Sequence, residues 1–136
     1  MHEVRTERGD PEGLLALARK AAEKAYAPYS GFRVGAAVLA EDGSIYTGAN
    51  VENAAYPSSS CAEATAVAHA ASEGMRKIIA TAVACIDARS LELAYPCGRC
   101  RQILNEFNAD MIYVTAAGTE FREHTMAELL PHGFKL

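Results

Sequence analysis

Two short segments place thiols at the starts of two predicted helices: "CAE" at residues 61–63 and "PCGRC" at residues 96–100. Cys97 and Cys100 are three residues apart, so on a helix they share one face. The free N–H groups at a helix start favour thiolates, the form of cysteine that binds metals. Helix starts that follow strands of one sheet can lie side by side at a sheet edge. The pattern therefore favours a fold in which the Cys61 thiol lies next to those of Cys97 and Cys100.

Hydrophobic periodicity divides the chain into helices and strands without repeats or linkers. Helical patterns, bounded by capping or helix-stopping residues, cover residues 10–26, 60–74, 98–107 and 125–130. Strand patterns cover residues 32–38, 45–51, 78–86, 111–115 and 119–123, and the first two form a hairpin about Asp42-Gly43. We therefore expect a single domain over residues 1–136, an α/β fold with helices packed on a five-stranded sheet.

The charge and hydropathy of the chain exclude several classes of partner. The formal net charge is -4, and no run of Lys and Arg is longer than a pair, so nucleic acid is not an expected partner. The first ten residues lack the apolar core of a signal peptide, and the longest apolar run, "IIATAVACI", is too short to cross a bilayer. We expect no membrane partner and a cytoplasmic location, where cysteines are free thiols or metal ligands.

The three thiols at the helix starts predict a zinc site. Cys97 and Cys100 alone could be a redox pair, half of a zinc site or two small buried residues. With Cys61 they make three ligands, the number that leaves a catalytic zinc ion an open position for water. Cys85 lies inside the apolar run and is expected to be a small buried hydrophobe. The four histidines are expected at surface or packing positions: His2, His69, His124 and His132.

Glu63 has two possible roles. Ser60 and Glu63 have the spacing of a capping box, in which each side chain binds a free N–H group of the helix start. Beside an open zinc position, the same carboxylate could instead face the water that zinc makes acidic and carry its protons. The thiol cluster favours the catalytic role, although Ser60 could still cap the helix through its own side chain.

These residues resemble the zinc-dependent nucleoside deaminases, whose signature is a His or Cys, then x, then Glu, followed by P-C-x-x-C. The resemblance extends to the small homotetrameric cytidine deaminases and runs from about Tyr26 to Phe134. In chain order it is carried by "YAPYSGFRVGAAV", "GANVENAAYP", "CAE", "PCGRCRQIL" and "ELLPHGF". It implies a three-layer α/β/α sandwich with a mixed five-stranded sheet, and a homotetramer whose active sites are shared between subunits.

The resemblance implies hydrolytic deamination of cytidine and deoxycytidine to uridine and deoxyuridine, with release of ammonia, in pyrimidine salvage. Cys61, Cys97 and Cys100 would bind one zinc ion per subunit. Glu63 would move protons from the attacking water to N3 of the pyrimidine ring and to the leaving amine. The N–H group of Ala62 would hold the pyrimidine O2.

Two other functions are compatible with parts of the pattern. A deaminase of a modified cytosine nucleoside, similar to the blasticidin-S deaminases, would share the zinc site. A structural zinc module would need a fourth protein ligand and would use Glu63 only as a cap. The segments "NVEN" and "LLPHGF" favour the cytidine deaminases over the first of these alternatives.

The resemblance also assigns substrate contacts outside the zinc site. Asn50 and Glu52 are two apart on a predicted strand, so they share a face and would bind the ribose hydroxyls. Phe32 would pack on the pyrimidine ring. From the residues alone, solvated positions are favoured for Asn50 and Glu52, and periodicity makes Phe32 a core or strand-start residue. Contacts across a subunit boundary, or closure over the base, are implied for Ala54, Tyr56 and Phe134.

The chain departs from the resemblance at Ala64. These enzymes commonly read "CAER" where this sequence reads "CAEA". In their three-cysteine members the arginine hydrogen-bonds the ligand sulfurs and offsets the net negative charge of one Zn²⁺ with three thiolates. Its loss is expected to leave the zinc more electron-rich, unless Arg99, Arg101 or the helix N-termini compensate.

Overall fold

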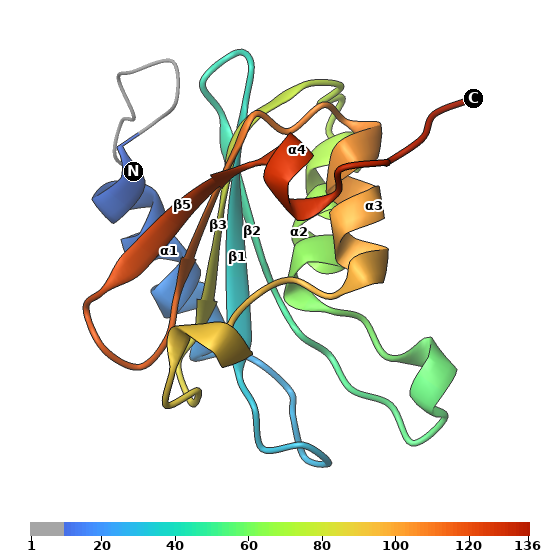
Figure 1. The fold of residues 1–136 in the computed structure, drawn as a ribbon. Helices are drawn as coiled ribbons and strands as arrows, with labels where there is room; N and C mark the ends of the chain where they lie inside the picture. Colours follow the sequence, from blue (N-terminus) through green and yellow to red (C-terminus); the bar gives the residue numbers. More distant parts are fainter. Residues whose placement is uncertain (1–9) are drawn as a thin grey trace.

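A five-stranded mixed sheet forms the centre of the computed structural model, which describes residues 10–136 (Figure 1). The strand order is β2-β1-β3-β4-β5. β1 (Val34–Ala40) runs antiparallel to β2 (Ile45–Ala49) and to β3 (Ile78–Cys85). β4 (Met111–Thr115) is parallel to β3, and β5 (Phe121–Thr125) is antiparallel to β4.

Helices cover both faces of this sheet (Figure 1). α1 (Pro11–Ala22) lies on one face, whereas α2 (Ala62–Ser72), α3 (Gly98–Glu106) and α4 (Met126–Leu129) lie on the other. The predicted three-layer α/β/α sandwich is therefore confirmed. Two 3-10 turns lie in the connections, at Tyr56–Ser58 and Leu91–Leu93. Within residues 10–136, no helix combines the length and apolarity needed to cross a membrane.

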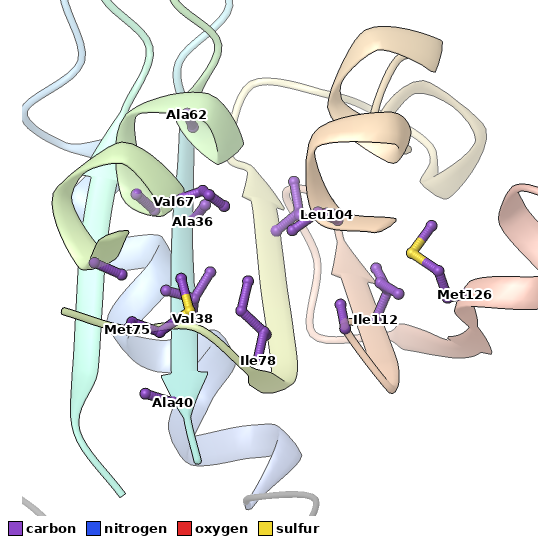
Figure 2. Packing of buried hydrophobic residues seen from close by; sticks show 14 of the residues in the cluster. Ala36, Val38, Ala40, Ala62, Val67, Met75, Ile78, Leu104, Ile112 and Met126 are labelled. Atoms are coloured by element: carbon purple, nitrogen blue, oxygen red, sulfur yellow. The ribbon is translucent and has the colours of Figure 1, made fainter. Parts of the chain in front are cut away.

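Side chains alternate between the two faces of β1 and feed two separate cores. Ala37 and Leu39 pack in the core beneath α1. Ala36 and Val38 belong to the opposite core, which Figure 2 shows together with Val67, Leu104 and Ile112 of α2, α3 and β4. The second core is the one that α2 and α3 share, so it fixes these two helices relative to each other.

Two glycines let helices approach the sheet closely. A Cβ atom on Gly48 of β2 would lie 2.5 Å from the backbone nitrogen of Ala66 in α2. A Cβ atom on Gly35 of β1 would overlap the backbone of α1 at Ala18 and Ala22. Glycine is required at both positions because the helix backbone itself occupies the space of a side chain. The alanines of α1 and α2 that face these two glycines also permit the helices to lie close to the sheet.

Most predicted elements are confirmed, although several begin or end a few residues from the predicted bounds. β1 and β5 begin two residues later than predicted, at Val34 and Phe121, and α2 begins at Ala62. β4 has the predicted bounds, and Thr125 and Glu128 form the predicted capping box of α4. α1 ends at Ala22 rather than Tyr26, because the Tyr26 N–H group donates to the Asn50 carbonyl at 2.9 Å and pairs with another segment. β2 ends at Ala49, so the predicted strand extension to residue 51 is wrong. His2 lies outside the described residues.

We expect Gly48→Ala to lower the free energy of unfolding by about 1–3 kcal/mol, the usual cost of overpacking. The added methyl group must displace the backbone of α2, which cannot move as a side-chain end can. Urea unfolding followed by circular dichroism measures the change. Gly118→Ala is the matched control, because a Cβ atom there meets no atom within 4 Å. Equal stability of the two variants would contradict the close approach of α2 to β2.

Candidate functional site

α2 and α3 begin close to each other, and a cysteine precedes each helix as its N-cap. Cys61 is the N-cap of α2 and Cys97 that of α3, and Cys100 lies in the first turn of α3. The three Sγ atoms all lie within 4.8 Å of one another. No side chain caps either helix start by a hydrogen bond. The predicted convergence of the three thiols is therefore present.

The thiol cluster fits a zinc ion. In a tetrahedral site with Zn–S distances of about 2.3 Å, the sulfurs lie about 3.8 Å apart, which agrees with the observed cluster. Within residues 10–136, no histidine, carboxylate or further cysteine joins the three thiols. Cys85 is buried at the end of β3, as expected. The donor set is thus three soft sulfur ligands with a fourth position left for a small molecule.

The thiols stabilise one negative charge among themselves. Hydrogen bonds from Cys100 and, more weakly, from Cys97 and Arg99 lower the pKa of Cys61 to about 6, against the opposing effect of burial. The pKa of Cys100 is raised, mainly by its hydrogen bond to Cys61. The cluster therefore holds a thiolate at Cys61 before any metal binds, which favours metal capture near neutral pH.

Glu63 lies in the first turn of α2 and is buried, with 4% of its surface exposed. Burial raises the pKa of its carboxyl group to about 7, and the nearby Cys61 charge adds to this rise. The predicted capping box is absent, because the helix begins one residue later than expected, with Cys61 as N-cap. The Ser60 hydroxyl instead pairs with Thr65 Oγ1 at 2.9 Å. Glu63 is thus not used as a helix cap.

A cavity of about 210 Å³ opens beside the thiols and Glu63. Its wall includes Cys61 and Cys97, and three of the predicted substrate contacts: Phe32, Asn50 and Ala62. Sequence reasoning missed the other lining residues, which are Ser30, Val34, Val83, Cys85, Leu93, Ala94 and Tyr95. Tyr95 could have been proposed from the sequence as a pocket residue, because it directly precedes the "PCGRC" segment. The remaining ones are contributed by loops and strand ends whose positions depend on tertiary packing.

The Asn50 side chain is built into the start of β1. Its Oδ1 atom accepts from the Val34 N–H group at 2.9 Å, and its Nδ2 atom donates to the Phe32 carbonyl at 2.8 Å. An amide oxygen has a second lone pair and the NH₂ group a second hydrogen. Asn50 therefore fixes the pocket wall and keeps one donor and one acceptor for a ligand.

Glu52 does not share a strand face with Asn50, because both follow the end of β2. Its carboxylate accepts from the N–H groups of Tyr29 and Ser30, at 2.9 and 3.1 Å, and from the Ser30 hydroxyl. The hydrogen bond from the Ser30 side chain is the main cause of a lowered Glu52 pKa. Glu52 does not line the pocket itself, but it holds Ser30, and Ser30 does line the pocket.

The remaining predicted contacts lie away from this pocket within the chain. Ala54 is exposed, and none of the three residues Ala54, Tyr56 and Phe134 lines the cavity. Tyr56 is 71% exposed and Phe134 is 65% exposed. The Tyr56 ring contacts Tyr29 edge-on, with ring centroids 6.0 Å apart. Within one chain, the structure thus does not bring these three predicted contacts to the pocket.

Arg99 and Arg101, the two arginines expected to compensate for Ala64, have different partners. Arg101 donates to the backbone carbonyls of Pro96 and Leu129, at 2.8 and 2.9 Å, and so links the start of α3 to the end of α4. Arg99 lies exposed in the first turn of α3 and is hydrogen-bonded to Cys61, whose pKa it helps to lower. Arg99, rather than Arg101, therefore brings positive charge to the thiols.

Known proteins of related sequence and fold are deaminases. The family model described as "Cytidine and deoxycytidylate deaminase zinc-binding region" matches residues 9–116. The chain is 49% identical over 127 residues to a cytidine deaminase of Sporosarcina psychrophila, a match that covers 92% of this chain and 91% of the relative. A cytidine deaminase of Halalkalibacterium halodurans is 45% identical over 127 residues, covering 92% of this chain and 94% of the relative.

The fold has a similarly close match among solved structures. The crystal structure of cytidine deaminase from Burkholderia pseudomallei superposes with a TM-score of 0.83 at 39% identity. The superposition covers 90% of this chain and 97% of that one. The matched region includes the elements that carry the thiol cluster, because nearly the whole of both chains is aligned.

We expect Arg99→Ala to weaken zinc binding about tenfold, within the range found when a residue that supports metal ligands is removed. The variant loses the cation that offsets thiolate charge at Cys61. Competition with a chromogenic chelator measures the affinity, and the exposed Arg89 supplies the control variant Arg89→Ala. Adding Ala64→Arg to Arg99→Ala is expected to restore part of the affinity. Unchanged zinc affinity in Arg99→Ala would contradict the role of this arginine.

Proposed function

The chain belongs to the cytidine and deoxycytidylate deaminase family of zinc-dependent hydrolases, and on this premise we propose that it deaminates cytidine and deoxycytidine. Water replaces the exocyclic amine, and the products are uridine or deoxyuridine and ammonia. The observation that carries the proposal is the arrangement of the site: three ligand thiols and the buried carboxyl group of Glu63 meet at one pocket.

The reaction needs a nucleophile and a group that moves protons. Cys61, Cys97 and Cys100 would hold zinc, which would supply the positive charge that makes water a good nucleophile near neutral pH. Glu63 accepts one proton of the attacking water and delivers it to N3 of the ring. It then transfers the second proton, from the new hydroxyl group on C4, to the amine, which leaves as ammonia when the C4–N bond breaks. A carboxyl group whose pKa burial raises to about 7 is suited to both accepting and donating.

The remaining pocket residues hold the nucleoside in place. The N–H group of Ala62, at the first position of α2, holds the pyrimidine O2. The Phe32 ring, 37% exposed at the pocket, packs on the base. Asn50 binds a ribose hydroxyl with its free amide hydrogen or lone pair. Glu52 adds a second ribose contact through Oε2, which among residues 10–136 accepts from the Ser30 hydroxyl and so has a lone pair left.

We also propose a homotetramer in which neighbouring subunits complete each pocket. The exposed apolar side chains that support an assembly include Tyr26, Tyr29, Val51, Tyr56 and Phe134, each with about half or more of its surface exposed. In the assembly Ala54 and Tyr56 reach the nucleoside bound by a neighbour, and Phe134 closes over the base. Free thiols and the acidic balance of the chain support a cytoplasmic role in pyrimidine salvage rather than action on nucleic acid.

The structural zinc module is less well supported than an enzyme. It would close the metal site with a fourth protein ligand, and none of the described residues joins the three thiols. A buried carboxyl group beside the metal would also be costly without a chemical use. A modified cytosine nucleoside would be handled by the same residues, so a panel of nucleoside substrates distinguishes it from cytidine and deoxycytidine.

We expect Glu63→Gln to lower kcat for cytidine by about 10²- to 10⁴-fold, the usual contribution of a proton-transfer group. Zinc content should stay at the parent level, because Glu63 is not a ligand. Ammonia release and metal analysis measure both quantities. Glu73→Gln, at an exposed position that ends the same helix, is the control. Full activity in Glu63→Gln would refute the mechanism. If the parent protein is inactive on both cytidine and deoxycytidine, only the substrate assignment is refuted.

We expect sharing of sites between subunits to appear as complementation. Glu63→Gln removes the proton shuttle of a subunit, and Tyr56→Ala removes the side chain that it lends to its neighbour. Co-expressed subunits of the two kinds should regain activity above the sum of the separate variants, because some mixed pockets contain both intact residues. Light scattering should give a tetramer mass. Additive activities in the mixed assembly would show that each subunit works alone.

A further inference from the structure

A chain of polar contacts leads from the pocket wall to β5, at the edge of the sheet. Tyr95 lines the pocket, and its hydroxyl group lies 2.6 Å from Nε2 of His124 in β5. The two rings also pack together, with centroids 5.2 Å apart. His124 Nδ1 lies 3.4 Å from Oε1 of Glu128 in α4. Glu128 is in turn held by the N–H group of Thr125 as part of the capping box.

His124 lies between Tyr95 and Glu128. Its Nε2 atom forms the hydrogen bond with the Tyr95 hydroxyl, and the tautomer of the ring sets which of the two groups donates. Its Nδ1 atom faces the Glu128 carboxylate, which can only accept. The tyrosine hydroxyl is thus held by a side chain of β5, at the edge of the sheet.

This arrangement restrains the segment that forms one side of the pocket. Leu93, Ala94 and Tyr95 all line the cavity and directly precede Cys97. The Tyr95 ring packs against the core shared by α2 and α3, so its ring is placed by packing and its hydroxyl by His124. Losing the hydroxyl bond removes the one side-chain hydrogen bond that His124 and Tyr95 share, while the ring remains.

We propose that Tyr95 is a positioning residue that sets how tightly a cytosine nucleoside binds, and that His124 acts on the pocket through it. The inference rests on the proposed function, since it concerns the same pocket. The pair orients the wall of the pocket and supplies neither a zinc ligand nor the proton-transfer group. Its loss should therefore raise KM and leave kcat nearly unchanged, the pattern of a group that supports binding in the ground state and the transition state alike.

Tyr95→Phe and His124→Phe test this proposal, because each keeps an aromatic ring and removes the hydrogen bond. We expect KM for cytidine to rise about tenfold in either variant, with kcat within about twofold of the parent, and the double variant to be no worse than either single one. His124→Gln, which can still accept and donate, should recover most of the affinity. Uridine binding measured by calorimetry should weaken in parallel, and zinc content should not change.

A second tyrosine–histidine pair provides the control. Tyr46 and His69 also contact each other, with ring centroids 5.3 Å apart, and do not line the pocket. Tyr46→Phe and His69→Phe should therefore leave KM unchanged. Parent-like KM values in Tyr95→Phe and His124→Phe would overturn the proposal, as would equal loss of kcat and zinc. A parent that neither binds uridine nor turns over cytidine would refute the proposed function, and this inference with it.

Discussion

The site depends on how closely α2 packs against β2. At Gly48 the helix backbone takes the space of a side chain, with Ala66 opposite. This contact fixes the height and direction of α2, so the first turn of the helix, with Cys61 and Glu63, has one position relative to the sheet. Leu104 in the shared core fixes α3 in the same layer. The thiols meet because two helices are held rigidly, and not because a loop folds around them.

Charge is the second constraint, because thiolates and a carboxylate cannot share a buried space without opposing charge. Two helix starts contribute partial positive charge along their axes. Arg99 adds a full charge next to Cys61 from the start of α3. The family resemblance expects that charge on α2, at the position of Ala64. In this chain a residue of the neighbouring helix, Arg99, supplies positive charge to the thiols.

Local signals predicted most of the fold and the thiol cluster, and tertiary contacts decided the rest. The capping box at Thr125 was predictable because both of its partners lie within one turn. The same spacing at Ser60 suggested a second capping box, which the structure does not contain. The Ser60 backbone pairs with Val51, and its hydroxyl group pairs with Thr65. No periodicity could reveal that Tyr26 leaves its helix to bond Asn50. The predicted end of α1 and the predicted start of α2 were therefore wrong because residues there pair with distant segments.

The same distinction explains why the pocket contains residues of two kinds. Glu63 and the thiols come from rigid helix starts, whereas the walls come from connecting segments that need restraints of their own. Asn50 bonds the start of β1, Glu52 holds the loop at Ser30, and His124 holds Tyr95. Each restraint joins segments that are distant in sequence, so each wall is fixed only once the sheet has formed. The positions of the thiols and of Glu63 are therefore set by the packing of two helices, and the shape of the pocket wall by restraints between connecting segments.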